Sequence, residues 1–199
     1  MNTRFSFISH AATEAQRKAA FPLDEPIHDV EDTRITDFSP AVFRADKIWS
    51  APEQRAQQTS RLMGLPVSIA EELRDCDYGR WRGLSMDKVQ NEEPVGILAW
   101  LTDPGASPHG GESIERLISR VGRWLDEQSD VKHAVAMTHP SVIRAAIVYA
   151  LSLPTQTFWR FDIAPLTVTD LRLNRNTGTL RCVGCPLRTR LIETGMTDV

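Results

Sequence analysis

The sequence is short of cysteine, of long apolar runs and of long basic blocks, and each shortage excludes a class of protein. Three cysteines in 199 residues cannot form a disulfide framework. No run approaches the ~18 apolar residues of a membrane span, and the N-terminal residues do not show the pattern of a signal peptide. With a formal net charge of −3 and no basic block, neither nucleic acid nor a membrane is expected as a partner. We therefore expect a cytoplasmic protein.

Two of the cysteines, Cys182 and Cys185, have the C-x-x-C spacing of redox and metal sites. A redox pair needs a thiolate that is stabilised at a helix N-terminus, whereas these cysteines lie at the end of a predicted strand and precede Pro186. A structural zinc needs four ligands, and the sequence offers no second pair. Neither redox chemistry nor a metal site is expected.

The length and the 41% hydrophobic content predict one globular domain that spans residues 1–199. Residues 14–45 contain three prolines and are expected to form a short helix, a loop and a second short helix. Apolar periodicity predicts the remaining minor elements, which are a strand at 65–70, helices at 85–90, 95–102 and 114–125, and a hairpin of strands 167–173 and 179–183.

Two predicted strands each end on a histidine. The apolar run before His10 and the run before His139 both read as buried strands, and the second leads directly into a helix that begins with Pro140. The carboxyl edge of an open α/β sheet is where such proteins bind ligands. A single histidine in this position is more often structural, but two of them indicate a functional site.

A third strand, residues 46–49, is followed by a predicted helix over Pro52 to Met63. Ser50 and Glu53 have the spacing of a capping box, and Pro52 suits the first turn. Arg55 lies near the N-terminus of this helix, where free amides and the helix dipole favour an anion, and a guanidinium can bind phosphate through two hydrogen bonds. The alternative is an ordinary solvated arginine.

The chain resembles the histidine phosphatase superfamily, the phosphoglycerate mutase-like enzymes, in five ordered motifs. Each is loose alone, and together they are specific. Residues 9–13 (SHAAT) are similar to the family's Arg-His-Gly-x-Thr, and residues 50–59 (SAPEQRAQQT) to its Ser-Ser-Pro-x-x-Arg-Ala-x-Gln-Thr. Residues 75–83 (DCDYGRWRG) resemble its acidic loop, residues 110–113 (GGES) its Gly-Glu-Ser, and residues 139–145 (HPSVIRA) its His-Gly-Gly-x-x-Arg-Ala.

The resemblance implies a single-domain α/β/α sandwich with a mostly parallel sheet and helices on both faces. It also implies phosphoryl transfer through a phosphohistidine, with no cofactor and no metal. His10 would be the nucleophile, Asp75 the general acid, and His139 a catalytic residue that holds the phosphoryl oxygens together with Arg55. Thr13 and Ser9, in the first motif, would complete the phosphate site.

Three positions depart from the family pattern. Ser9 stands where the family has an arginine, Ala11 replaces the glycine after the nucleophile, and Pro140 replaces the glycine after the second histidine. Loss of one charge-stabilising donor costs about 10²–10³ in rate if nothing replaces it.

These features leave three readings open. The first is a phosphatase of ordinary or weak activity for a small phosphomonoester; the second is a degenerate relative that binds inorganic phosphate, another anion or a protein partner without turnover. The third is an unrelated α/β binding protein. A hydrolase is favoured over a mutase, because the chain lacks the long insertions that the family's mutases use to retain a phosphorylated intermediate. The substrate and the oligomeric state, monomer or homodimer, stay open.

Overall fold

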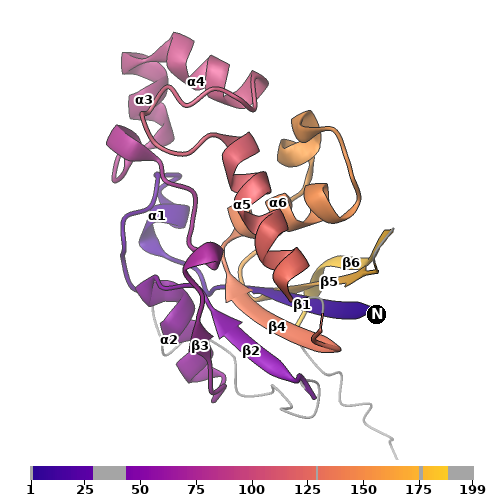
Figure 1. The fold of residues 1–199 in the computed structure, drawn as a ribbon. Coiled ribbons are helices and arrows are strands. Elements are labelled where there is room, and N and C mark those ends of the chain that lie inside the picture. Colours follow the sequence, from indigo (N-terminus) through magenta and orange to yellow (C-terminus); the bar gives the residue numbers. More distant parts are fainter. Residues whose placement is uncertain (1, 29–43, 129, 175–176, 188–199) are drawn as a thin grey trace, which may run out of the picture.

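The computed structural model describes residues 2–28, 44–128, 130–174 and 177–187, and its centre is a six-stranded sheet in the order β3-β2-β4-β1-β5-β6 (Figure 1). Three strand pairs, β1 with β4, β2 with β4 and β2 with β3, are parallel. The pairs β1 with β5 and β5 with β6 are antiparallel. The strands are β1 (Thr3–Ser9), β2 (Lys47–Ser50), β3 (Ser68–Ile69), β4 (His133–Thr138), β5 (Thr167–Leu173) and β6 (Gly178–Pro186).

Helices cover both faces of this sheet, as predicted. From β1 the chain moves across the sheet to β2 and β3, and it then returns to β4 and β5. Because parallel crossovers are right-handed, this reversal places α2 on one face and α5 and α6 on the other. Figure 1 shows α5 and α6 side by side, with α3 and α4 at the far end of the molecule. The helices are α1 (Glu14–Arg17), α2 (Gln54–Leu62), α3 (Met86–Glu92), α4 (Pro94–Thr102), α5 (Ile114–Glu127) and α6 (Pro140–Ala150).

The core joins β1 to α5. Phe5 and Phe7 are two residues apart in β1, so their side chains lie on the same face of the strand. The ring of Trp124 packs against both, at centroid distances of 5.9 and 6.4 Å. The predicted apolar stripe of α5 is buried, and the hydroxyl of Ser113 caps this helix by accepting the Arg116 amide. Burial of such side chains is the main stabilising contribution, at about 1.5–3 kcal/mol for each large one.

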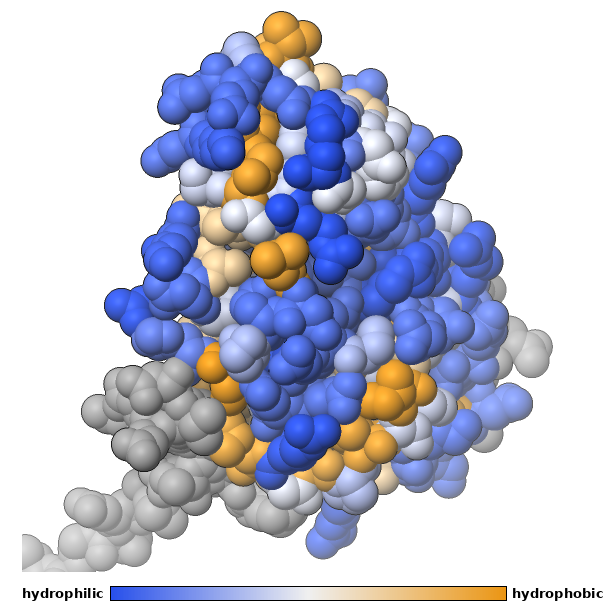
Figure 2. Space-filling model, turned by 90° about the vertical axis from the view of Figure 1, so that its left-hand side faces the viewer, coloured by the Kyte–Doolittle hydropathy of each residue, from blue (hydrophilic) through white to orange (hydrophobic). Residues whose placement is uncertain are grey.

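One face of the molecule is mainly hydrophilic. Figure 2 shows hydrophilic residues over most of one side of the molecule, with apolar residues as separate spots. Within the described ranges, no helix is long and apolar enough to span a bilayer.

Three local predictions were wrong or incomplete. The predicted capping box at the start of α2 does not form, because Ser50 ends β2 and its hydroxyl donates to the Ala51 carbonyl, while Glu53 precedes α2 without a side-chain capping bond. β3 has two residues instead of six, and its side chains are exposed. Of the two short helices expected in residues 14–45, the first is α1, and the second would fall in residues 29–43, outside the described residues.

Two glycines let the acidic loop approach the segment that precedes α5. A Cβ atom at Gly79 would lie 2.2 Å from the His109 carbonyl oxygen, and one at Gly111 would lie 2.0 Å from the Asp77 carbonyl oxygen. Backbone hydrogen bonds from Arg80 to His109 and from Glu112 to Asp77 join the two segments at this point. The backbone contacts that hold the acidic loop in place therefore leave no room for a side chain at position 79 or 111.

We expect Gly111→Ala to destabilise the protein by about 1–3 kcal/mol, because its methyl group would overlap a backbone carbonyl that cannot move alone. Gly96→Ala in α4 is the matched control, since its Cβ atom would meet neighbours no closer than 3.4 Å and alanine favours helix. Urea unfolding of both variants measures the difference. Equal stabilities would contradict the steric explanation.

Candidate functional site

His10 and His139 lie next to each other at the carboxyl edge of the sheet. They directly follow β1 and β4, which are neighbouring parallel strands with Ser9 opposite Thr138. Both side chains are buried, and the ring centroids are 5.1 Å apart in an edge-to-face arrangement. The two strand ends therefore deliver both imidazoles to one place.

The His10 ring is held as a neutral imidazole. Burial, and then the electrostatic effect of His139 and of Arg55, lower its pKa to about 3. The Nδ1–H group donates to the carbonyl oxygen of Ala11 at 2.7 Å. This bond places the ring proton on Nδ1, so the lone pair is on Nε2. The ring can act as a nucleophile at neutral pH without losing a proton first.

Arg55 is buried, with 2% of its side chain exposed, and its donors are committed to three protein groups. The Nε–H group donates to His139 Nδ1 at 3.2 Å, and the terminal nitrogens donate to the Leu23 carbonyl and to Asp75 Oδ2, both at 2.7 Å. This burial excludes the alternative that Arg55 is an ordinary solvated arginine on the surface of the helix.

Glu53 is a site residue that the sequence analysis assigned to helix capping. Its Oε2 atom accepts a 2.7 Å hydrogen bond from His139 Nε2, and its Oε1 atom accepts one from the Asp75 amide at 2.9 Å. Burial favours the neutral acid, but the hydrogen bond from His139 and the electrostatic effect of that residue outweigh it and lower the pKa of Glu53. The carboxylate therefore fixes His139 with its proton on Nε2.

Asp75 is satisfied as a carboxylate on both oxygens. Oδ2 accepts from Arg55, and Oδ1 accepts from the Ser141 hydroxyl at 2.5 Å and from the Cys76 amide at 2.8 Å. Burial alone would raise its pKa, but the electrostatic effects of His139 and Arg55 prevail and hold the pKa of Asp75 well below its usual range. In this structure Asp75 has no proton to give.

Arg120 of α5 holds the main chain of the acidic loop, and it is a second residue that sequence reasoning missed. Its side chain is buried and forms a two-pronged ion pair with Glu112, with N–O distances of 2.8 and 2.6 Å. The remaining donors bind the carbonyl oxygens of Glu72, Arg74 and Asp75. A charged position inside an apolar helical stripe was the signal that could have found it.

Cys76 follows the acid directly and is buried. Its thiol points to the Glu112 carbonyl oxygen at 3.5 Å, and burial followed by the charge of Asp75 raises the pKa of the thiol well above its usual value. It is therefore a thiol and not a thiolate at neutral pH.

The two other residues expected at the phosphate site lie differently. Thr13 lines the cavity beside His10, and its hydroxyl also caps α1 by accepting the Gln16 amide. Ser9 lines neither of the two cavities described below, and its fully buried hydroxyl has no hydrogen-bond partner in the described part of the chain. Ser9 does not supply the missing arginine's contact.

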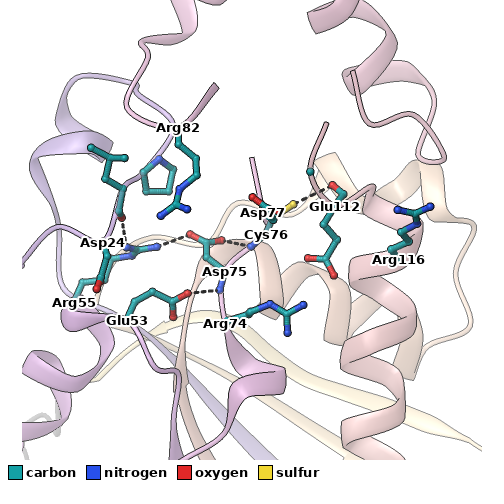
Figure 3. Close-up of a pocket in the computed structure, with 13 residues that line it drawn as sticks. Asp24, Glu53, Arg55, Arg74, Asp75, Cys76, Asp77, Arg82, Glu112 and Arg116 are labelled. Atoms are coloured by element: carbon teal, nitrogen blue, oxygen red, sulfur yellow. Dashed lines mark hydrogen bonds and ion pairs between the residues drawn. The ribbon is translucent and has the colours of Figure 1, made fainter. Parts of the chain in front are cut away.

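Two adjoining cavities meet at Arg55 and Asp75. The smaller, about 110 Å³, is lined by His10, Thr13, Ser141 and aromatic side chains that include Trp100 and Trp159. The larger, about 460 Å³, is an open groove with charged walls (Figure 3). Among the described residues, no group of three or more histidine, cysteine, aspartate or glutamate side chains is placed to hold a metal ion.

Comparison with known proteins relates most of the chain to one family. The family model for the "Histidine phosphatase superfamily (branch 1)" matches residues 7–186. The adenosylcobalamin/alpha-ribazole phosphatase of Salmonella typhimurium is 27% identical over 174 residues, which is 80% of this chain and 85% of that protein.

Solved structures agree with the fold. A putative alpha-ribazole-5'-P phosphatase from Escherichia coli superposes with a TM-score of 0.80 at 21% identity, over 94% of this chain and 98% of that one. A mycobacterial glucosyl-3-phosphoglycerate phosphatase in complex with inorganic phosphate gives 0.78 at 20% identity, over 94% and 99%. At these identities the likeness establishes the fold.

The lowered pKa of His10 predicts a pH-dependent stability. In the unfolded chain His10 binds a proton below about pH 6.5, its ordinary pKa, whereas in the native state it does so only near pH 3. Unfolding therefore becomes easier as the pH falls through this window. We expect the stability of the wild type relative to His10→Gln to fall by about 1.4 kcal/mol per pH unit from pH 6 towards pH 4. Urea unfolding at several pH values measures it, and the other histidines cancel in the comparison. Parallel profiles for the two proteins would show that His10 is not held neutral.

Proposed function

The chain belongs to the histidine phosphatase superfamily, and from this premise we propose that it hydrolyses a small phosphomonoester through a phosphohistidine on His10. The observation that carries the proposal is the state of His10, which is neutral, buried and oriented by Ala11 so that the Nε2 lone pair is available. Splitting a difficult displacement into two easier ones is what such a nucleophile provides.

Arg55 and His139 would bind the phosphoryl oxygens. Arg55 donates to His139 and Asp75 in this structure, so an incoming phosphate dianion would compete for these hydrogen bonds. Once Arg55 turns to the phosphate, His139 Nδ1 loses its donor and is free to take a proton and donate to a phosphoryl oxygen. Glu53 then stabilises the resulting imidazolium through Nε2.

Asp75 would be the general acid, and its low pKa makes that role depend on the substrate. The bound dianion offsets the electrostatic effects of both His139 and Arg55, which hold the pKa of Asp75 down, so burial then dominates and favours the protonated carboxyl. In the first step the His10 Nε2–phosphorus bond forms, the bond to the leaving oxygen breaks, and Asp75 gives that oxygen its proton. In the second step Asp75 takes a proton from water, the oxygen of that water bonds to phosphorus and the nitrogen–phosphorus bond breaks, which releases inorganic phosphate.

A second candidate, anion binding without turnover, is favoured by one observation. Each nitrogen of the Arg55 guanidinium already donates to a protein group, and Ser9 contributes no contact where the family has an arginine. A phosphate would therefore compete with these groups for Arg55, with one cation fewer than usual in the site. A panel of phosphate esters separates an active enzyme from a binding protein.

We expect the protein to release phosphate from p-nitrophenyl phosphate with a chelator present, and His10→Ala to abolish this release. Asp75→Asn should slow phenyl phosphate about tenfold more than p-nitrophenyl phosphate, because the better leaving group needs little protonation. Steady-state rates on the two esters test both statements. Persistent activity in His10→Ala would exclude the covalent mechanism, and tight phosphate binding with no turnover would favour the second candidate.

Glu53→Gln should lower kcat by about 10² while the protein stays folded, which is the scale of losing one transition-state donor. A glutamine whose oxygen accepts the Asp75 amide would turn its NH₂ group toward His139 Nε2 and so move the ring proton to Nδ1, where it opposes Arg55. Steady-state kinetics and nitrogen NMR of the His139 ring check the two effects. Glu71→Gln, an exposed glutamate outside both cavities, is the control. An unchanged tautomer with full activity would remove Glu53 from the site.

A further inference from the structure

The open groove beside the reaction centre carries arginines that the proposed chemistry does not use. Arg74, Arg82 and Arg116 line it together with five carboxylates. No ion pair involves any of these three arginines in the described part of the chain, and the one side-chain hydrogen bond among them is a 3.3 Å contact from Arg74 to the Glu71 carbonyl. All three are exposed.

The carboxylates of the groove are largely committed elsewhere. Glu53 is bound to His139, Asp75 to Arg55, and Glu112 to the buried Arg120. Asp24 and Asp77 each use one oxygen to accept a backbone amide, from Gln54 and Gly79. Within the described residues, Glu53, Asp24 and Asp77 therefore keep a charge without a guanidinium partner and match the three free arginines in number, but the hydrogen-bond donors of those arginines stay available to a ligand.

The geometry also determines what enters the groove. The cavity with His10 has about 110 Å³, which suits a phosphoryl group and little more. Asp75, which has to reach the leaving oxygen, lines this cavity and the groove as well. The leaving group therefore extends past Asp75 into about 460 Å³, a volume within the range of small-molecule sites.

Arg82 and Arg74 are drawn beside Asp75 in Figure 3. Figure 3 shows the Arg82 guanidinium extending toward the Arg55–Asp75 pair, Arg74 below Asp75, and Arg116 on the far side of Glu112. The backbone of Arg82 is anchored, because its amide donates to the Gly79 carbonyl and the next amide, Gly83, donates to Phe21. A fixed backbone with an unpaired side chain leaves the guanidinium free to meet a ligand.

We propose that Arg82 and Arg74 bind a second anionic group on the leaving part of the substrate, a phosphate or a carboxylate. The inference rests on the proposed phosphatase function and names its substrate class, which is a phosphomonoester with an anionic leaving group. A guanidinium fork matches both anions through paired hydrogen bonds.

Three esters of similar size test this: glycerol 3-phosphate, 3-phosphoglycerate and 1,3-propanediol bisphosphate. We expect kcat/KM to be at least about tenfold higher for the two esters with a second anion, mainly through KM, with a preference that weakens in salt. Arg82→Gln and Arg74→Gln should each remove most of this preference and leave glycerol 3-phosphate unchanged. Arg123→Gln, an exposed arginine of α5 outside the groove, is the matched control.

An unchanged preference in both arginine variants would overturn the inference while the phosphatase function stands. If one anion alone depends on the arginines, the site is specific for that anion. Should none of the esters turn over, the proposed function fails instead, and calorimetric titration of the same protein with the bisphosphate and with propyl phosphate decides the inference. Tighter binding of the bisphosphate that is lost in Arg82→Gln would support it, and equal binding would overturn it.

Discussion

The buried guanidinium of Arg55 is the interaction on which the arrangement of the site depends. It links helix α2 to the second histidine, to the acidic loop and to the main chain at Leu23. A buried charge without partners costs several kcal/mol, so these groups must stay close to Arg55 as long as the protein is folded. The site is therefore assembled before any ligand arrives, and a phosphate would have to compete with groups that already satisfy the arginine.

This competition connects binding to proton transfer. Together with His139, the same arginine that would hold the phosphate lowers the pKa of Asp75 and keeps this carboxylate ionised. A dianion that draws on Arg55 would release Asp75 from that influence, so the acid would become available when there is something to protonate. Hydrogen bonds also join Arg55 to His139 and His139 to Glu53. Phosphate binding would therefore affect His139 as well, because its Nδ1 atom accepts from Arg55 and can bind a proton only when Arg55 turns away.

Periodicity and motifs predicted the strands and histidines that form the site, but they missed Glu53 and Arg120, which hold those residues and the acidic loop in place. The apolar runs before His10 and His139 are long enough to indicate parallel strands, so their meeting at one edge was predictable. Glu53 was misread because its spacing from Ser50 is also that of a capping box, and only the tertiary position of His139 decides between the two. Arg120 was missed because a buried arginine is unusual, and because three of its partners are backbone carbonyls, which a sequence does not reveal; its fourth partner is the Glu112 side chain. The substitution at Ser9 was visible, but its consequence, a hydroxyl outside both cavities, required the structure.

Cys76 is held as a thiol, and this affects how the site would respond to oxidants and alkylating agents. Enzymes that attack phosphorus with a cysteine depend on a thiolate, and the same thiolate reacts with peroxides and alkylating agents. Here the proposed nucleophile is the imidazole of His10, and the sulfur of Cys76 is buried and kept protonated. Oxidising conditions that inactivate enzymes with a catalytic thiolate would therefore leave the side chains of this site chemically unchanged.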